Sequence, residues 1–258
     1  MTSFPFTSAL VTGASSGIGE EIARQLADAG VPTVVVARRG ERLRRLADEL
    51  PGIEVLEADL LDAEALAAVG ARLTDPERPI ELLVNNAGFG TSGEFHSLDS
   101  DRLGREIDLN VGVLTQLAHR ALATMIPRRR GWLLNVSSVA SFQPAPRLAV
   151  YAATKAYVTS LTESLHGEVA GTGVKVSALC PGLTKTEFQA VSNTGRYQTQ
   201  FPDFVWTSVE EVARAGLDGV VKGRALVVPG AVYKGIVSAG SFTPRWLKRA
   251  VAGMVQRT

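Results

Sequence analysis

Short runs of apolar, often β-branched residues alternate along the chain with longer segments of helical periodicity. Several runs are continuously apolar rather than alternating, which is typical of strands covered on both faces of a parallel sheet. The predicted strands are Ala9–Thr12, Thr33–Ala37, Ile53–Glu57, Glu81–Asn85, Trp132–Val136, Val174–Leu179 and Leu226–Val228. This order of elements predicts an α/β fold built from βαβ units around a parallel sheet.

Two helices can be placed between the first strands, and two later segments break the alternation. Apolar side chains recur at helical spacing over residues 18–26 and 43–50, with stops at Gly30 and at Pro51-Gly52. Residues 184–207 place aromatic side chains among polar ones, and a segment of this length without regular structure is usually a lid or a binding loop.

The last segment, residues 230–258, follows Pro229 and contains a helix start at Thr243-Pro244. The apolar face of that helix must cover another surface. No internal repeat, low-complexity linker or domain boundary is visible, so we expect one domain over residues 1–258.

Composition narrows the class of protein. Hydrophobic residues make up 45% of the 258, which is enough to cover both faces of a sheet. Lys plus Arg total 27 and Asp plus Glu 26, so the charges nearly cancel. This balance does not indicate binding to nucleic acid or to an anionic membrane. The single cysteine, Cys180, suits a reducing compartment, and without a signal peptide or membrane span we expect a cytoplasmic protein. The histidines share no metal-ligand spacing, and no metal site is expected.

A glycine-rich segment follows the first predicted strand. Gly13 comes directly after the strand, and Gly17 and Gly19 precede an amphipathic helix. Such glycines let the backbone approach a pyrophosphate, whose charge is favoured by the free N–H groups at the helix N-terminus. A glycine-rich turn alone is a modest signal.

Three polar residues further along the chain have the chemistry for proton transfer. Tyr151 and Lys155 stand four residues apart, and Tyr151 comes thirteen residues after Ser138. A phenol with a pKa of about 10 is a poor proton relay at neutral pH, but an ammonium one helical turn away favours the phenolate. Tyr151 would then protonate a carbonyl oxygen in reduction or accept a hydroxyl proton in oxidation. By itself this spacing also fits a solvated pair on a helix surface.

Together these motifs resemble the short-chain dehydrogenase/reductase family, from about residue 7 to about residue 187 and more loosely to the strand at 226–228. Further positions match the family pattern: Asp59 after the third strand, Asn85-Asn86-Ala87-Gly88 at the fourth, Asn110 in the next helix, and Pro181-Gly182 after the sixth strand. The resemblance implies one doubly wound Rossmann-type domain of about seven strands, in the order 3-2-1-4-5-6-7, with an added C-terminal helical tail. It also implies an enzyme that interconverts carbonyls and alcohols.

The resemblance assigns a role to each matching residue. The implied dinucleotide site comprises Gly13, Ser15, Ser16, Gly17, Ile18, Gly19, Arg38, Arg39, Asp59, Leu60, Asn86, Ala87, Gly88, Tyr151, Lys155, Pro181, Gly182, Thr184 and Thr186. The implied catalytic set is Asn110, Ser138, Tyr151 and Lys155, in which Ser138 orients the carbonyl oxygen and Asn110 holds a water beside Lys155. Ser137 competes for the serine role, and the family spacing of twelve intervening residues selects Ser138.

The end of the second strand favours NADP(H) over NAD(H). It reads Val36-Ala37-Arg38-Arg39, without a carboxylate. An acidic residue there would bind the ribose 2′-hydroxyl of NAD, whereas an arginine accommodates and pairs with the 2′-phosphate of NADP. The alternative is that both arginines are merely solvated.

Aromatic side chains near the expected nicotinamide end favour an apolar ketone or aldehyde as substrate. Each can bury on the order of 150–250 Å². They are Phe89, Phe142, Phe188, Phe201, Phe204 and Trp206. The alternative is that these rings pack into the protein's own core or into a dimer contact.

The segment after Gly230 departs from the family pattern, because many members end in a glycine-rich segment shortly after the last strand, whereas this chain adds about 28 residues. The common tetramer of the family uses that end in one of its interfaces. We therefore expect a homo-oligomer, a dimer rather than a tetramer, paired through the long helices that hold Asn110 and Tyr151. Two rival functions stay open. One is a catalytically idle dinucleotide sensor or scaffold, against which the intact proton-transfer set argues. The other is a membrane-surface module that uses the basic and apolar residues of 245–257.

Overall fold

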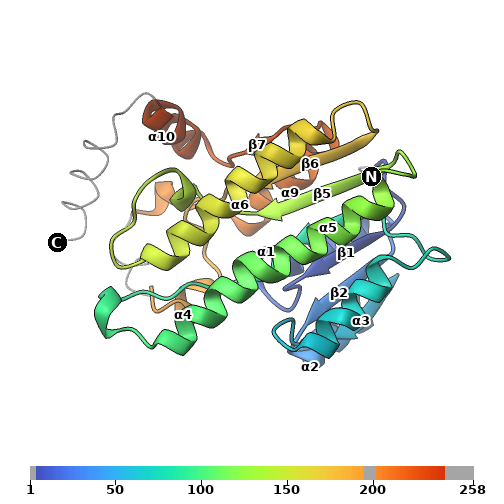
Figure 1. Ribbon diagram of the computed structural model, residues 1–258, viewed down its shortest axis with the longest axis horizontal. Helices are drawn as coiled ribbons and strands as arrows, with labels where there is room; N and C mark the ends of the chain where they lie inside the picture. The colour runs from blue at the N-terminus through green and yellow to red at the C-terminus, as the bar shows by residue number, and fades with distance from the viewer. Residues whose placement is uncertain (1–3, 195–201, 242–258) are drawn as a thin grey trace.

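The computed structural model describes residues 4–194 and 202–241. Seven parallel strands form one sheet in the order β3-β2-β1-β4-β5-β6-β7, as the family resemblance implied. Figure 1 shows helices packed on this sheet. Their bounds are β1 Ala9–Thr12, β2 Thr33–Ala37, β3 Ile53–Glu57, β4 Leu82–Asn85, β5 Gly131–Val136, β6 Val174–Leu179 and β7 Leu226–Val227. The predicted strands agree with these bounds to within one residue at each end.

Helices connect the strands and cover both faces of the sheet. They are α1 Gly17–Asp28, α2 Gly40–Glu49, α3 Ala63–Leu73, α4 Ser100–Ile107, α5 Leu114–Met125, α6 Ala149–Glu168, α7 Phe188–Val191, α9 Val209–Val221 and α10 Ala231–Ser241. Four short elements complete the description: η1 Phe95–Ser97, η2 Asp108–Val113, η3 Val139–Phe142 and η4 Asp203–Val205. Gly30 ends the first helix in the left-handed region, with φ of 73°, as expected.

The core has two halves, one on each face of the sheet, because successive residues of a strand point to opposite faces. On β1, Val11 joins a cluster formed by α1, α2 and α9, and Leu10 joins a cluster formed by α3 and α5. Both side chains are fully buried. The continuously apolar strands of the sequence are thus explained by helices on both sides.

The two segments that broke the sequence pattern contain regular structure. Residues 184–207 include α7 and η4, and an isolated bridge pairs Thr184 with Thr207, so the segment begins and ends side by side. The expectation of a structureless insert was therefore wrong for the described part of this segment. Residues 230–258 include α10, whereas the expected helix start at Thr243-Pro244 and the basic residues of 245–257 lie outside the described residues.

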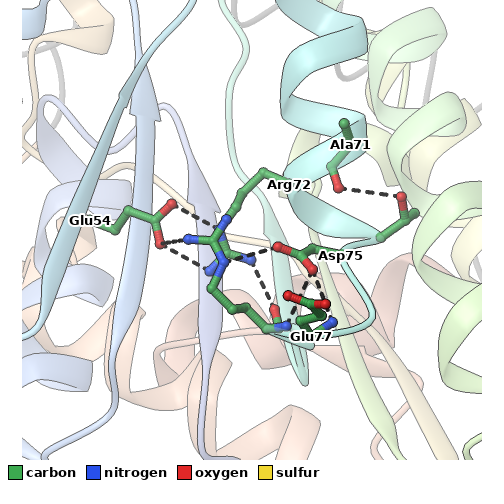
Figure 2. Close-up of polar contacts among 7 residues, drawn as sticks. Glu54, Ala71, Arg72, Asp75 and Glu77 are labelled. Carbon is green, nitrogen blue, oxygen red and sulfur yellow. Dashed lines mark hydrogen bonds and ion pairs between the residues drawn. The ribbon is translucent and has the colours of Figure 1, made fainter.

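A polar cluster ties α3 to the edge strand β3 (Figure 2). The guanidinium of Arg72 donates from Nε and Nη2 to the two carboxylate oxygens of Glu54, at 2.8 and 3.0 Å. Its Nη1 also donates to the backbone carbonyl of Arg78 at 2.9 Å. These contacts lower the pKa of Glu54, chiefly through the hydrogen bonds from Arg72. Arg72 is 12% exposed, so its contact with Glu54 is shielded on one side.

Replacement of Arg72 by alanine should lower the free energy of unfolding by about 1.5 kcal/mol, the low end for hydrogen bonds to charged groups, because solvent screens the half-exposed carboxylate. Arg78→Ala is the comparison variant, since Arg78 is 60% exposed, stands 3.6 Å from the same carboxylate and forms its closer ion pair, at 2.9 Å, with Asp75. Urea unfolding of both variants measures the difference. If both variants lost the same free energy of unfolding, the two hydrogen bonds from Arg72 to Glu54 would contribute no more than the exposed contacts of Arg78.

Candidate active site

A cleft of about 1370 Å³ opens at the carboxyl edge of the sheet. Parallel strands all end at this edge, so the loops after β1, β2, β4, β5 and β6 meet there. Every residue predicted for cofactor binding or catalysis lines this cleft, apart from Gly19 and Asn110. Those two lie directly behind its wall, against Gly13 and Gly88 respectively. The structure therefore brings the whole predicted set together.

The glycine loop is shaped by contacts that leave no room for side chains. Gly13 has φ of 68°, and a Cβ there would stand 2.8 Å from the side-chain nitrogen of Asn86. A Cβ on Gly19 would collide with the carbonyl of Gly13 and with the same amide. Gly17 has φ of 58° and faces Thr186. The loop is thus a bare backbone surface at the start of α1, as a pyrophosphate requires.

Thr12 fastens this loop to the end of β4. Its hydroxyl accepts hydrogen bonds from the backbone N–H groups of Asn86 and Ala87, both at 3.0 Å. The side-chain amide of Asn86 donates in return to the carbonyls of Thr12, at 2.9 Å, and Gly13, at 3.2 Å. The crevice between β1 and β4 is the point where strand order reverses, which is where such folds bind ligands.

The two arginines after β2 differ in their contacts. Arg38 is 63% exposed, and its Nη1 stands 3.8 Å from a carboxylate oxygen of Asp59. Arg39 instead reaches the glycine loop, donating to the hydroxyls of Ser15 at 3.1 Å and Ser16 at 2.7 Å. Both line the adenosine end expected of the cleft, together with Asp59 and Leu60.

Tyr151 and Lys155 lie one turn apart on α6 and point into the cleft from a buried position. Tyr151 is 9% exposed and Lys155 is 5% exposed. The ammonium nitrogen of Lys155 donates to the carbonyl of Val136 at 2.8 Å and lies 5.7 Å from the centre of the Tyr151 ring. The alternative of a solvated surface pair is thereby excluded.

Burial governs the protonation of both groups. It raises the pKa of Tyr151 to about 12, and a hydrogen bond with the Ser138 side chain opposes this rise. It lowers the pKa of Lys155 to about 8. The hydrogen bond with Ser138 thus favours the phenolate form of Tyr151 and opposes the effect of burial. The phenol is protonated at neutral pH, the form needed to donate a proton.

The contacts of the two adjacent serines separate their roles. Ser137 is 2% exposed, and its hydroxyl bonds to the carbonyl of Lys155 at 2.9 Å and to the hydroxyl of Thr159 at 2.7 Å. Ser138 stands at the start of η3, where its hydroxyl accepts from the N–H of Ala140 at 3.1 Å. Ser137 thus fixes α6 to the end of β5, and Ser138 has the hydroxyl that interacts with Tyr151.

Asn110 sits in η2, a π-helical turn between α4 and α5. Single π-turns inside α-helices occur frequently at functional sites. The side-chain amide of Asn110 donates to the carbonyl of Phe89 at 2.8 Å and to the hydroxyl of Thr154 at 3.1 Å, and Thr154 donates to the carbonyl of Tyr151. Asn110 therefore joins the β4 loop to α6 behind the Tyr151–Lys155 pair.

The substrate side of the cleft is lined partly by different residues from those expected. Phe188 packs on Tyr151 with ring centres 5.2 Å apart, and Phe89 also lines the cleft. Phe142 and Trp206 are absent from the lining, and Phe204 is 75% exposed. Phe201 lies outside the described residues. Further apolar residues of the cleft lining include Leu148, Leu183, Val191, Val205, Val232, Tyr233 and Ile236.

Sequence reasoning missed a buried acid beside the site. Glu106 on α4 is fully buried, and neither of its carboxylate oxygens has a hydrogen-bond partner of good geometry among the described residues. Burial raises its pKa, while the Thr91 hydroxyl, Arg102 and Lys155 oppose the rise. Its spacing of four residues before Asn110 places both on one helical face, which was the available signal.

Two other features were also missed. Glu187 forms ion pairs with Arg39 and Arg42. The hydroxyl of Tyr233 on α10 accepts a hydrogen bond from the backbone N–H of Leu183 at 2.9 Å. Within residues 4–194 and 202–241, no cluster of His, Cys, Asp and Glu is arranged to hold a metal ion. In the same part of the chain, no helix has the length and apolarity needed to cross a membrane.

The bare glycine loop and the buried Tyr–Lys pair, at one edge of a doubly wound sheet, define a dinucleotide-dependent oxidoreductase. Residues 7–196 match the family model for short chain dehydrogenases. The chain belongs to the short-chain dehydrogenase/reductase family. One relative, sulfoacetaldehyde reductase 2 of Chromohalobacter salexigens, is 37% identical over 191 residues, covering 72% of this chain and 76% of the relative.

Solved structures of the family superpose closely on this fold. A short-chain dehydrogenase from Sphingobium yanoikuyae in complex with NADPH is 34% identical, with a TM-score of 0.82 over 91% of this chain and 92% of that chain. The bulky-bulky ketone specific alcohol dehydrogenase from Comamonas testosteroni is 32% identical, with a TM-score of 0.78 over the same shares. The chain is therefore an oxidoreductase of the class that acts on CH–OH and C=O groups with NAD(P).

Proposed function

We propose that the chain is an NADP(H)-dependent oxidoreductase of an apolar ketone or aldehyde and the corresponding alcohol, with Tyr151 as the acid/base group. One observation carries this proposal. The phenol of Tyr151, with Ser138 and Lys155 beside it, lines the same cleft as the glycine loop. A substrate carbonyl at Tyr151 and a dinucleotide on the loop would share one enclosed volume.

The glycine loop fits the phosphates of a dinucleotide, because Gly13 and Gly19 leave backbone surface where any Cβ would collide. Gly88 extends this surface toward the catalytic end, since a Cβ there would stand 2.7 Å from the side-chain oxygen of Asn110. When bound, a nicotinamide cofactor supplies or accepts the hydride. The protein residues supply placement and the proton.

In reduction, Tyr151 donates its phenolic proton to the carbonyl oxygen as that oxygen gains charge, while the hydroxyl of Ser138 donates a hydrogen bond to the same oxygen. The ammonium of Lys155 stabilises the resulting phenolate. Asn110 holds the α6 backbone in place through Thr154, and we propose that it also positions the water through which Lys155 exchanges protons with solvent. Oxidation reverses each step.

Tyr151→Phe should lower kcat by about 10²–10⁴-fold, the usual contribution of a positioned general acid. Cofactor affinity should change little, because the phenol proton is needed only in the chemical step. Lys155→Ala should lower both kcat and cofactor affinity, because the ammonium is proposed to hold the nicotinamide ribose as well. Steady-state kinetics and cofactor titrations of both variants measure this.

Near-parental kcat in Tyr151→Phe would remove the acid assignment. The rival reading, a catalytically idle dinucleotide sensor, predicts a different result. In that case cofactor binds, the parent turns over no carbonyl, and neither substitution has a kinetic effect.

The preference for NADP(H) is supported by charge at the adenosine end. Arg38 and Arg39 line it, and Ser15 and Ser16 are within hydrogen-bond reach of Arg39. The Sphingobium yanoikuyae relative was solved with NADPH. Asp59 is the carboxylate beside Arg38, but it belongs to the loop after β3 rather than to the end of β2.

Arg38→Asp should weaken NADPH binding about ten- to a hundredfold, because a charge-assisted contact to phosphate contributes about 1.5–3 kcal/mol. NADH binding should not weaken. Arg44→Asp is the matched control, since Arg44 lies on α2, the helix that follows Arg38, is 58% exposed and pairs with Glu57 outside the cleft. Fluorescence titration of both cofactors against the three proteins measures the effect. An unchanged preference in Arg38→Asp would place the selectivity elsewhere.

An apolar substrate is supported by the rings and aliphatic side chains around Tyr151. Phe188 packs directly on the phenol ring, and Leu183, Val191 and Ile236 line the cleft nearby. The Comamonas testosteroni relative is named for bulky ketones, which agrees with this proposal, whereas the Chromohalobacter salexigens relative is named for a small sulfonated aldehyde.

A matched pair of substrates tests the class. We expect a higher kcat/KM for an alkyl aryl ketone than for a polyhydroxylated or phosphorylated sugar of similar size, because the lining offers apolar contact around the carbonyl. NADPH consumption measures both. A higher value for the sugar would remove the apolar-pocket proposal and leave the oxidoreductase class intact.

The homodimer remains a proposal. Large apolar side chains are exposed on the helices expected to pair, including Ile107 on α4, 46% exposed, and Tyr157 on α6, 41% exposed. Their exposure on helices adjoining the site supports pairing through this face.

A further inference from the structure

Glu187 occupies an anion site at the mouth of the cofactor cleft. Its Oε2 stands 2.7 Å from Nη1 of Arg39, and its Oε1 stands 2.7 Å from Nη1 of Arg42. Arg39 precedes α2 and Arg42 lies in its first turn, whereas Glu187 comes from the segment between β6 and α7. The carboxylate therefore bridges two parts of the chain that are far apart in sequence.

The remaining donors of Arg39 mark the site as one that suits a phosphate. Its Nε and Nη2 donate to the hydroxyls of Ser15 and Ser16, at the tip of the glycine loop. A guanidinium beside two hydroxyls and a glycine loop is suited to bind phosphate oxygens. In the chain alone, the anion that this guanidinium holds is the carboxylate of Glu187.

The charge on Glu187 is permanent under ordinary conditions. Hydrogen bonds from Arg39, and then from Arg42, lower the pKa of Glu187 to about 2. The carboxylate is thus ionised throughout the range in which the protein would work. Its side chain is 44% exposed, so both ion pairs are screened by solvent, and neither is strong enough to exclude a doubly charged competitor.

We propose that Glu187 is a specificity-determining residue that competes with the 2′-phosphate of the cofactor for Arg39 and thereby limits the preference for NADP(H) over NAD(H). This inference rests on the proposed NADP(H) function. NAD(H) has no 2′-phosphate and leaves the Glu187–Arg39 contact intact. NADP(H) must replace that contact, and part of its binding free energy offsets the loss.

Arg42 decides how strongly Glu187 competes. When a phosphate takes Arg39, Glu187 keeps Arg42 as a second partner, so the displaced carboxylate is still paired. Without Arg42, Glu187 would have Arg39 alone and would resist displacement more. Arg42 does not line the cleft, which supports a role through Glu187 rather than through contact with the cofactor.

The Glu187–Arg39 ion pair also links the choice between NADP(H) and NAD(H) to the substrate side of the cleft. Glu187 lies between Thr186, which packs against Gly17 of the glycine loop, and Phe188, which packs on Tyr151. Displacement of Glu187 from Arg39 therefore loosens one anchor of the segment that covers the phenol. NADP(H) would release this anchor, and NAD(H) would not.

The experiment measures dissociation constants for NADPH, NADH and adenosine 2′,5′-bisphosphate, which carries the 2′-phosphate without the nicotinamide. Glu187→Gln keeps the shape of the side chain and removes its charge. We expect affinity for NADPH and for the bisphosphate to rise about three- to tenfold, the effect of losing one or two half-exposed ion pairs, with NADH changed less than about twofold. Asp203→Asn is the matched control, because it removes an exposed ion pair with Lys185 in the same segment and should change none of the three.

A double-mutant cycle with Arg42→Ala separates competition from direct contact. Competition predicts that Arg42→Ala weakens NADPH binding in the parent and has no effect in the Glu187→Gln background. Equal weakening in both backgrounds would mean that Arg42 itself binds the phosphate, and would overturn the proposal. Thermal unfolding of each variant confirms that the fold is retained.

The ratio of the dissociation constants for NADPH and NADH distinguishes failure of this inference from failure of the proposed function. A parent that binds both cofactors equally contradicts the NADP(H) preference, yet a selective gain in Glu187→Gln still supports competition. A parent that prefers NADPH, with an unchanged ratio in Glu187→Gln, overturns competition and leaves the proposed function standing. If Glu187→Gln raises the affinity for NADPH and for NADH by the same factor, the competition proposal is overturned as well.

Discussion

The candidate site depends on the hydrogen bonds that join the ends of β1 and β4. The hydroxyl of Thr12 accepts hydrogen bonds from two backbone N–H groups of the β4 loop. The side-chain amide of Asn86 in turn donates to the backbone carbonyl of Thr12. Between parallel strands such a cross-link is needed where the ladder stops, because polar groups would otherwise be left without partners in a buried crevice. The glycines follow from it, since Gly13 and Gly19 have no space for a Cβ beside the Asn86 amide. A bare phosphate-binding surface is thus a consequence of how two strand ends are joined.

Burial sets the chemistry at the other end of the cleft. Tyr151 and Lys155 are both almost fully enclosed, and burial moves their pKa values in opposite directions, to about 12 and about 8. Both shifts are toward the neutral form because charge is costly in an apolar surrounding, although with a pKa of about 8 Lys155 is still mostly an ammonium at neutral pH. Glu106 adds a buried acid whose charge, when present, raises the pKa of both groups. The protonation of the site is therefore a property of the enclosure formed by α4, η2 and α6, and the two side chains alone do not determine it.

The sequence predicted the strands of the sheet, and it predicted site residues that the structure brings together around one cleft, because both depend on local patterns. Continuous apolar runs identified β1 and β2, and the positions after each strand identified the cleft residues. Other features depend on contacts between distant segments. The partners of Glu187 come from the start of α2, more than 140 residues earlier, as the separation of 145 from Arg42 shows. Trp206 and Phe142 were expected in the cleft from their positions, in the segment after Pro181-Gly182 and near Ser138, and neither lines it. A position in the sequence does not determine which way a loop side chain points.

The segment after β6 links the two ends of the cleft. It carries Thr186 against the glycine loop, Glu187 against the arginines and Phe188 against Tyr151, in three consecutive residues. Under the proposed competition, displacement of Glu187 from Arg39 would move the chain next to Phe188, the residue that packs on Tyr151. The Thr184–Thr207 bridge limits that movement, since it fixes where the segment leaves and rejoins the sheet edge. The segment on the substrate side is thus fixed where it begins and ends, and the proposed competition at Glu187 would act on the residues between.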